Sequence, residues 1–446
     1  MIQPPSSPTA AERIDALMEL HPKGYDLSLD RISALLEKLG NPQDKLPPVI
    51  HVAGTNGKGS TIAFTRAILE AAGLSVHVHT SPHLVQWSER YRLGQAGAPG
   101  KLVDDAVLSE AIKRVADANQ GNAITVFEIL TAVMFVLFSE HPADACIVEV
   151  GLGGRFDASN VMNDVDVSVI TPVSLDHEAF LGNTLAKIAF EKAGIIKPKT
   201  ALVVGDQEDE ALQVIESVAA KNLAPTAIAQ QDFHVEQQNG RFVFSDDDCL
   251  LDLSPPALPG LHQFSNAATA IAAAKQFCKI NRHELDHKMI DQGLKQTQWP
   301  GRLQHLTSGK LIDMLPPETD VWIDGGHNPS AAKAISAMLE SMQSRDTRSV
   351  IMICGMLNTK DSSRYLAPFE PWLHSMITVP IVTSDAGIEP EELARQAKAV
   401  GIAARSSSSL IKAIQSIKHP QPFRLLIAGS LYLVGDTLEQ NNTFPN

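Results

Sequence analysis

The chain has 446 residues, of which 44% are hydrophobic and 20% are charged. This composition excludes a disordered chain, and the length corresponds to about two or three globular domains. The 37 Lys and Arg residues stand against 51 Asp and Glu residues, which gives a formal net charge of −14. Such an acidic excess argues against general binding to nucleic acid or to an anionic membrane.

Cysteine usage and the absence of export signals point to the cytoplasm. The four cysteines are widely spaced and include no C-x-x-C pair, so we expect reduced thiols, not a disulfide scaffold or a zinc ribbon. The amino terminus has no secretory signal pattern, and the longest apolar run, at 129–138, is too short to span a bilayer. We therefore expect a cytoplasmic protein with no membrane partner.

The first strand–helix–strand unit is predicted around a glycine-rich turn. Apolar residues at helical spacing predict a helix over 27–39, and a β-branched run predicts a strand at 49–53. The glycine-rich segment 54–60 follows, and then a helix over 61–72 and a strand over 74–79. This order is that of a βαβ unit, so we expect an α/β fold with a mostly parallel sheet.

The same alternation continues along the chain. Further helices are predicted at 104–119, 127–140, 183–194 and 263–279, and further strands at 146–151, 167–173 and 201–205. Residues 228–254 differ, because short alternating runs surround Asn239-Gly240. That pair is a hairpin signal, so we expect a small antiparallel piece there.

Pro300-Gly301 is predicted to separate two domains, 1–298 and 299–446. Apolar strands separated by helical patterns are predicted in the second domain, at 320–326, 349–355, 375–382 and 424–430. The second part is therefore expected to be a smaller, Rossmann-like α/β domain.

The glycine-rich turn is the sharpest local signal for function. Backbone N–H groups of such a turn, together with the N-terminus of the next helix, form an anion site. Lys58, which we expect to be exposed in this loop, adds a cation, and Ser60 or Thr61 offers a hydroxyl for magnesium. Val52 and Gly59 stand where the usual P-loop has Gly and Ser or Thr, so this is a variant loop. The alternative is a glycine turn with an incidental lysine.

Two candidate metal ligands follow predicted strands of the same sheet. Glu149 lies in an apolar strand, where a lone carboxylate is costly unless it is paired or binds a metal. Its place at the carboxyl end of the strand suits magnesium beside nucleotide phosphates. The alternative is a structural Glu149–Arg155 ion pair. Asp176-His177 follow the next strand, so His177 is expected at the same edge.

The loop from Asp324 to Pro329 is a candidate ligand site in the second domain. It ends an apolar strand and begins a helix, and such loops bind ligands in α/β sheets. Asp324 is suited to hold a ribose or an amine, and His327 a phosphate. The alternative, compatible with the first, is helix capping by Asn328 with Pro329 at the first helical position.

Taken together, these segments resemble the folylpolyglutamate synthase/dihydrofolate synthase family, within the wider ATP-dependent Mur-ligase group. The matching segments run in the family's order: HVAGTNGKGS (51–60), TSPHL (80–84), TVFE (125–128), VEVGLGGRFDASN (148–160), DHEAFLG (176–182), IAFEKAGIIK (188–197), HQFSNAATA (262–270), WPGRL (299–303) and DGGHNP (324–329). They span most of the chain. The resemblance implies a P-loop, Mur-ligase-like ATP-binding domain followed by the C-terminal ligase domain.

The resemblance further implies an acid–amino-acid ligase. Such an enzyme adds L-glutamate to dihydropteroate, to the glutamate tail of tetrahydrofolate, or to both, through an acyl phosphate formed from ATP. The implied cofactors are Mg2+, with two ions, and a monovalent cation, and the implied state is a monomer. The intact segments 125–128 and 153–157 favour the bifunctional bacterial type, but the sequence leaves the acceptor open.

The same resemblance assigns site residues. The catalytic set is Lys58, His177, Lys192, Asp324 and His327. The ATP-binding set is Asn56, Gly57, Lys58, Gly59, Ser60, Asn266, Arg302 and Asp324. The metal ligands are Ser60, Ser81, Glu149, His177 and Lys192 as a carbamate. The pterin-binding set is Leu27, Ser28, Leu29, Thr125, Val126, Phe127, Glu128, Arg155 and Asp157, with Ser28 where the family has glycine.

Local chemistry and the resemblance disagree at Lys192. Its position alone indicates an ordinary cation at a helix C-terminus, whereas the family carries a carbamylated lysine there, which is an anion able to support a metal. The alternative is an unmodified Lys192 neutralised by Glu191.

Two other functions fit parts of the pattern. A muramyl ligase would carry an additional UDP-binding domain before the phosphate loop, and Ser or Thr in place of Gly59. A nucleotide-dependent switch would need the loop, but not Glu149, His177 and Lys192 together.

Overall fold

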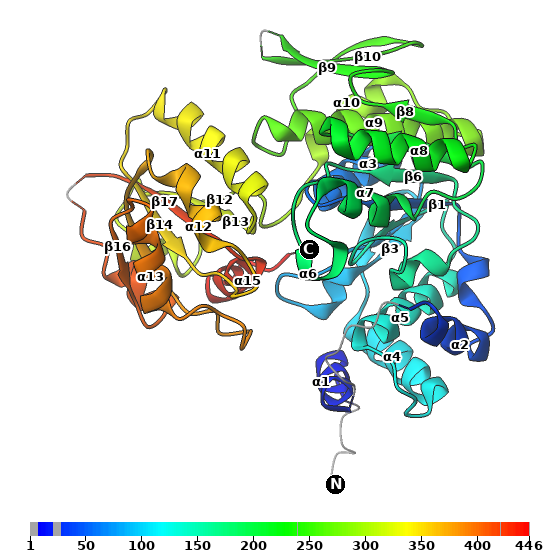
Figure 1. Cartoon of the computed structure of the whole chain (residues 1–446), viewed down its shortest axis with the longest axis horizontal. Coiled ribbons are helices and arrows are strands. Elements are labelled where there is room, and N and C mark those ends of the chain that lie inside the picture. The colour runs from blue at the N-terminus through cyan, green and yellow to red at the C-terminus, as the bar shows by residue number, and fades with distance from the viewer. Residues whose placement is uncertain (1–7, 21–27, 239, 420, 446) are drawn as a thin grey trace. The chain divides into compact units, whose positions relative to one another are not determined.

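The computed structural model describes residues 8–20, 28–238, 240–419 and 421–445 (Figure 1). The chain forms two compact units. The first contains residues up to 256 together with 264–297, and the second contains 257–263 and 298–445.

The first unit is built on an eight-stranded sheet with the order β4-β3-β2-β5-β1-β6-β7-β8. Its strands are β1 (Val49–Ala53), β2 (Val76–His79), β3 (Tyr91–Gln95), β4 (Ala98–Leu102), β5 (Ala145–Glu149), β6 (Val167–Ile170), β7 (Ala201–Val204) and β8 (Thr226–Ile228). The strands β2, β5, β1, β6, β7 and β8 pair in parallel with their neighbours in the sheet. β3 and β4 add an antiparallel edge beside β2. The expected, mostly parallel sheet is confirmed.

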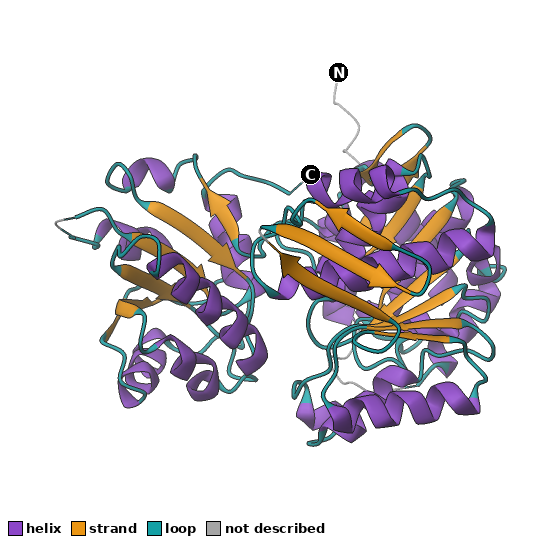
Figure 2. Ribbon diagram, turned by 90° about the horizontal axis from the view of Figure 1, so that it is seen from above, coloured by secondary structure: helices purple, strands orange, loops and turns teal. Residues whose placement is uncertain are grey.

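Helices lie on both faces of this sheet (Figure 2). They are α1 (Ala10–Leu20), α2 (Asp30–Lys38), α3 (Lys58–Ala71), α4 (Asp105–Asn119), α5 (Val126–Glu140), α6 (Glu178–Leu181), α7 (Leu185–Ala193), α8 (Asp209–Lys221), α9 (His262–Asn281) and α10 (His287–Gln296). A buried core joins Val49 and Val148 of the sheet to Phe135 of α5. α3 contacts β1, β2 and β5. The central strands β1 and β5 are therefore covered, which explains why their sequences are almost continuously apolar.

A separate three-stranded antiparallel sheet, β11-β10-β9, belongs to the first unit. Its strands are β9 (Phe233–Gln238), β10 (Arg241–Asp246) and β11 (Leu250–Leu253). β9 and β10 pair across Gly240, which has a positive φ of 77°. The predicted antiparallel piece is confirmed, whereas Asn239 of the predicted turn lies outside the described residues.

The second unit has a six-stranded sheet with the order β12-β13-β17-β14-β15-β16. Its strands are β12 (Gln304–Leu306), β13 (Asp320–Asp324), β14 (Val350–Cys354), β15 (Leu373–Thr378), β16 (Ala404–Ser406) and β17 (Arg424–Ala428), and its helices are α11 (Pro329–Gln343), α12 (Ser362–Leu366), α13 (Pro390–Ala399), α14 (Leu410–Gln415) and α15 (Leu431–Gln440). All pairs are parallel except β12 with β13. This is the expected α/β architecture.

The structure corrects the sequence prediction at two places in the first unit. α3 begins at Lys58, before the predicted start at 61. The β3–β4 hairpin was not predicted, because Gly94, Gly97, Pro99 and Gly100 give it the composition of a loop. Backbone pairing with β2 orders it as strands.

All four cysteines are free thiols, of which three are buried and Cys249 is partly exposed. Within the ranges that the structure describes, none of the helices has both the length and the apolar character needed to cross a bilayer.

Candidate active site

The glycine-rich segment forms the turn between β1 and α3. Gly57 precedes α3 with a φ of +83°, in the left-handed region that favours glycine. A Cβ atom at this position would lie 2.4 Å from Oδ1 of Asn266 in α9. The turn therefore needs glycine for both reasons, and Asn266 lies directly against it. Two predicted ATP-binding positions, distant in sequence, are thus brought together.

Hydrogen bonds tie the turn to the chain that follows β6. The side chain of Asn56 donates to Ser174 Oγ (3.0 Å), and the hydroxyl of Thr55 donates to the Ser174 carbonyl (3.1 Å). The first helical bond of α3 runs from the Thr61 N–H to the Gly57 carbonyl (2.8 Å). The N–H groups of residues 58–60 come before this first helical bond and lie at the N-terminus of α3. Backbone N–H groups at such a terminus can bind an anion.

Lys58 is more enclosed than the sequence suggested. It is the first residue of α3, and its side chain is 18% exposed. Its Nζ donates to the Gly54 carbonyl (3.2 Å) and lies 3.8 Å from Glu149 Oε1. The prediction of an exposed loop lysine is wrong, because the helix starts at Lys58 and the neighbouring strand β5 places a carboxylate beside it.

Glu149 ends β5 with a buried carboxylate. Its Oε2 accepts a hydrogen bond from the Ser81 backbone N–H (3.0 Å). The alternative Glu149–Arg155 ion pair is not formed, because Arg155 pairs with Glu191 at 2.7 Å. A buried carboxylate facing a phosphate-type loop is a suitable hard ligand for a divalent cation.

Lys192 lies near the end of α7 and is buried. Its Nζ donates to the Gly54 carbonyl (2.8 Å), the same oxygen that Lys58 contacts. Burial, reinforced by the nearby Lys58 cation, lowers the pKa of Lys192 to about 7, against the opposing effect of Asp176 and Asp157. A large share of this amine is therefore neutral near pH 7.

The proposed metal ligands have the chemistry of a magnesium site. Glu149 offers carboxylate oxygens, and Ser60 and Ser81 carry hydroxyls. Within the described part of the chain, the buried Oγ1 of Thr61 has no hydrogen-bond partner. These are the oxygen donors that a small, hard cation prefers, and an orphaned buried hydroxyl fits such an ion.

His177 is placed differently from the other candidate ligands. It is 47% exposed, has a φ of +53°, and its Nε2 lies 4.0 Å from Asp176 Oδ1. Among the residues that the structure describes, no three His, Cys, Asp or Glu side chains form a ready metal cluster. Any ion here would therefore depend on hydroxyls, substrate oxygens or a modified lysine to complete its shell.

The predicted pterin segment begins α5. Thr125 and Glu128 form a capping box, in which the Thr125 N–H donates to Glu128 Oε2 (2.8 Å) and the Glu128 N–H donates to Thr125 Oγ1 (3.2 Å). Glu128 also pairs with Arg31 of α2 at 3.2 Å. The sequence analysis missed Arg31, because nothing in the local pattern shows that α2 packs on α5.

The two predicted pterin segments lie together. Leu29, Val126 and Phe127 pack against the same core cluster. The hydroxyl of Ser28 donates to Asp30 Oδ2 (2.9 Å) at the start of α2. Leu27, the first residue of the predicted set, lies outside the described residues.

Arg155 and Asp157 lie in different surroundings. The Arg155 guanidinium lies over the rings of Phe156 (4.4 Å) and Phe190 (5.1 Å), both partly exposed. Asp157 is buried, and its carboxylate accepts the backbone N–H groups of Leu152 (2.9 Å) and Ser159 (3.0 Å). Of the two, Arg155 is the residue able to meet a ligand directly, whereas Asp157 organises its own loop.

In the second unit, Asp324 organises the predicted ligand loop. It ends β13, and its carboxylate accepts the N–H groups of Leu303 (2.8 Å) and Gly326 (2.6 Å). His262 lies near Asp324 and Arg302, and its pKa is lowered. Burial is the main cause and the Arg302 cation adds to it, whereas the negative charge of Asp324 opposes both. Asp324 and Arg302 are therefore brought together within this unit, and His262 is a neighbour that the sequence analysis did not single out.

His327 and Asn328 follow on the same loop. His327 Nδ1 lies 3.0 Å from the Gly325 carbonyl oxygen. Asn328 caps α11 by accepting the Ala331 N–H (2.9 Å), and Pro329 is the first helical residue. The capping interpretation is confirmed.

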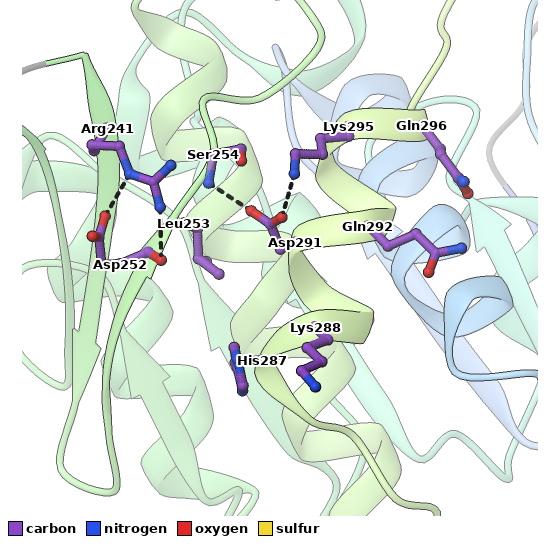
Figure 3. Close-up of a pocket in the computed structure, with 10 residues that line it drawn as sticks. All are labelled: Arg241, Asp252, Leu253, Ser254, His287, Lys288, Asp291, Gln292, Lys295 and Gln296. Carbon is purple, nitrogen blue, oxygen red and sulfur yellow. Dashed lines mark hydrogen bonds and ion pairs between the residues drawn. The ribbon is translucent and has the colours of Figure 1, made fainter.

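A pocket of about 550 Å³ lies between the small sheet and α10 in the first unit (Figure 3). Asp291 on its wall accepts the Ser254 N–H (2.6 Å) and pairs with Lys295 (2.7 Å), and Arg241 pairs with Asp252 (2.8 Å). None of the predicted site residues that the structure describes lines it. Its acidic groups are already paired within the wall, so we do not assign the chemistry to this pocket.

Comparisons with known proteins identify the family of the chain. Residues 52–274 match the Mur ligase middle domain, and 302–431 match the Mur ligase glutamate ligase domain. The dihydrofolate synthase/folylpolyglutamate synthase of Bacillus subtilis is 33% identical over 93% of this chain and 94% of its own length. The structure of Escherichia coli FolC in complex with DHPP and ADP has a TM-score of 0.85 at 30% identity, covering 98% of both chains.

A second similar structure carries more ligands. It is a bifunctional folylpolyglutamate synthase/dihydrofolate synthase with Mn, AMPPNP and L-glutamate bound. Its TM-score is 0.81 at 30% identity, covering 97% of this chain and 99% of that one.

Proposed function

This chain belongs to the dihydrofolate synthase/folylpolyglutamate synthase family of Mur ligases, and we propose that it uses ATP to join L-glutamate to dihydropteroate and to reduced folates. The observation that carries the proposal is the convergence of Lys58 and Lys192 on the Gly54 carbonyl, with Glu149 beside Lys58. This arrangement places two amines and a buried carboxylate at a loop suited to phosphates.

The reaction divides into two steps. The acceptor carboxylate attacks the γ-phosphorus of ATP, so that a carboxyl–phosphate bond forms and the bond to ADP breaks. The amine of glutamate then attacks the acyl carbon, phosphate leaves, and the amine loses its proton. The N-terminus of α3 and the Lys58 ammonium hold the phosphates and stabilise the negative charge that moves onto ADP and then onto phosphate.

Glu149, Ser60, Ser81 and His177 are the residues that we propose hold magnesium. When bound, the metal neutralises charge on the phosphate oxygens. The Glu149 carboxylate is held towards this place by the Ser81 N–H and by Lys58. Arg302, Asp324 and His327 are further proposed nucleotide contacts, and this proposal rests on the family resemblance. The similar bifunctional enzyme binds manganese, AMPPNP and L-glutamate.

Replacing Glu149 or His177 with alanine is expected to raise the magnesium concentration needed for half-maximal activity by about tenfold or more, because a hard cation with few protein ligands loses affinity with each one. The measurement is a magnesium titration of ligase activity. Glu178→Ala removes an exposed acid next to His177 and is the matched control. Titration curves for both variants that overlay the parent's would show that the metal lies elsewhere.

We also propose that Lys192 carries a carbamate. Its lowered pKa supplies the neutral amine that adds to carbon dioxide. The alternative neutraliser, Glu191, is engaged with Arg155 at 2.7 Å. An anion at Lys192 suits a site with two metal ions better than a second ammonium beside Lys58.

The remaining expectations rest on the family resemblance or, for the location, on the cysteine usage and the missing export signal. They are a second magnesium ion, a monovalent cation, a monomeric state and a cytoplasmic location. They remain proposals for this chain.

Phosphate release tests the function directly. We expect release to rise by about tenfold or more only when an acceptor and L-glutamate are both present, because the acyl phosphate forms on the acceptor and is consumed by the amine. Dihydropteroate and tetrahydrofolate should be compared side by side, and the intact segments 125–128 and 153–157 lead us to expect activity with both. Release that needs no acceptor would support a nucleotide switch instead, and activity confined to a muramyl acceptor would support a cell-wall ligase.

A further inference from the structure

A buried histidine connects the strand before the phosphate loop to the loop after Glu149. His51 lies in β1, and its side chain is fully buried. Its Nε2 is 2.9 Å from the hydroxyl of Ser159, in the short 3-10 helix Ala158–Val161. The Ser159 hydroxyl is in turn 2.5 Å from Asp157 Oδ1. Three polar side chains therefore form a continuous chain through the core.

The direction of each hydrogen bond follows from the donors around Asp157. Its carboxylate accepts the backbone N–H groups of Leu152 and Ser159. A group surrounded by donors acts as an acceptor, so the Ser159 hydroxyl donates to Asp157. The Ser159 oxygen must then accept from His51, which fixes the proton on Nε2. Nδ1 of His51 is left as the bare ring nitrogen, and it is buried with no hydrogen-bond partner among the residues that the structure describes.

His51 stays neutral, so it acts as a fixed donor. Burial, aided by the Lys197 cation, lowers the pKa of His51 to about 3. A ring with this pKa does not take up a second proton near neutral pH, so only one of its two nitrogens carries a proton. The bond to Ser159 therefore has one orientation.

The loop that Asp157 holds touches the proposed site on two sides. A Cβ atom at Gly151 would lie 2.2 Å from the ring of Phe127, so the loop packs directly on the proposed pterin segment. On the other side, the Arg155 N–H donates to the Glu191 carbonyl (2.7 Å), next to Lys192. A shift of the loop would move both neighbours, whereas the side chains of Thr55 and Asn56 in the phosphate-type turn donate to Ser174, after β6.

We propose that His51 is a positioning residue for the acceptor. Acting through Ser159 and Asp157, it fixes the loop 151–157 against Phe127 and against α7. This role rests on the proposed ligase function for its kinetic consequence, whereas the hydrogen-bond relay stands on geometry alone.

The kinetic experiment compares the acceptor with ATP. His51→Leu and Ser159→Ala are each expected to lower kcat/KM for the pterin acceptor by about tenfold and to change KM for ATP by less than about twofold. His51→Gln should recover most of the loss, because its amide nitrogen reaches about the place of Nε2 and donates. The double variant His51→Leu/Ser159→Ala should be no worse than the poorer single variant, since both remove the same relay.

Ser168→Ala is the matched control. Ser168 pairs with His51 across β1 and β6, is equally buried, and donates to the Ile195 carbonyl (3.1 Å) outside the relay. Ser168→Ala should lower the free energy of unfolding, but it should not lower kcat/KM for the pterin acceptor selectively over the constants for ATP. Equal losses for acceptor and ATP in His51→Leu, or additive losses in the double variant, would reduce His51 to a packing residue.

Nitrogen NMR of the full chain separates the relay from the ligase function. We expect His51 to show the neutral Nε2–H form from about pH 5 to about pH 8, with ring nitrogen shifts that change in Ser159→Ala. An Nδ1–H form, or titration in this range, would overturn the relay. A parent chain with the expected His51 spectrum but no ligase activity would instead refute the proposed function and leave the relay standing.

Discussion

Lys58→Ala is expected to lower ligase turnover by about a thousandfold, with either acceptor, while the chain still folds. The side chain contributes a fixed cation 3.2 Å from the Gly54 carbonyl and 3.8 Å from Glu149, at the N-terminus of α3. The charge that moves from the γ-phosphoryl group to ADP would lose this cation in the transition state. Steady-state kinetics with saturating ATP would measure the loss in kcat.

Folding needs a separate readout for this variant, because the buried Glu149 carboxylate loses a cationic neighbour. We expect a loss of about 1 kcal/mol in the free energy of unfolding, too small to unfold the chain. Lys113→Ala, at an exposed lysine of α4, is the control for removal of a surface amine. Near-normal turnover by a folded Lys58→Ala protein would refute the phosphate-loop assignment.

The second large effect is expected at Lys192. Lys192→Ala should lower activity by about a hundredfold, and short carboxylic acids added to the assay should restore part of it by occupying the place of the carbamate. We expect this rescue because the group that the variant lacks is the anionic carbamate, which a carboxylate resembles, and not an ammonium. Lys197→Ala is the matched control, because Lys197 is a partly buried lysine whose Nζ donates to the Asn160 carbonyl (2.9 Å). Carboxylic acids should restore nothing in that variant.

The pH dependence of the modification has a defined sign. Burial lowers the pKa of Lys192 from 10.5 to about 7, so the neutral amine grows as pH rises through 7. At constant dissolved carbon dioxide, carbamate should therefore increase between about pH 6 and about pH 8, which carbon-13 NMR with labelled bicarbonate would follow. An unmodified ammonium at Lys192 in a high-resolution map of the magnesium- and nucleotide-bound protein would refute the carbamate.

The same shift makes a prediction for stability. Below about pH 7 the parent must keep a buried ammonium that the unfolded chain would solvate, and this cost disappears as pH rises from 7 towards 10.5. Lys192→Ala should therefore gain stability relative to the parent in acid. A variant that is less stable than the parent at every pH would instead identify Lys192 as a structural residue.

Much of the architecture was predictable from the sequence because the signals are local. A β-branched run, a glycine turn and a helical pattern identify β1, the phosphate-type loop and α3 without knowledge of the rest of the chain. The same holds for the α11 cap, where Asn328 and Pro329 carry the signal in adjacent positions. The β3–β4 edge was missed, because its glycines and proline are typical of a loop and only its pairing with β2 makes it a strand.

Which side chains meet was decided by the tertiary structure. Sequence alone offered Arg155 as the partner of Glu149 and Glu191 as the partner of Lys192, whereas the fold pairs Arg155 with Glu191. Glu149 meets Lys58 instead, because of the strand order. β1, which leads into the phosphate-type loop, lies between β5 and β6, so the end of β5 lies beside the start of α3. Burial then changes the charge of the amine: at a helix end in water it is an ordinary cation, whereas enclosure in the core lowers the pKa of Lys192 to about 7 and leaves it partly neutral.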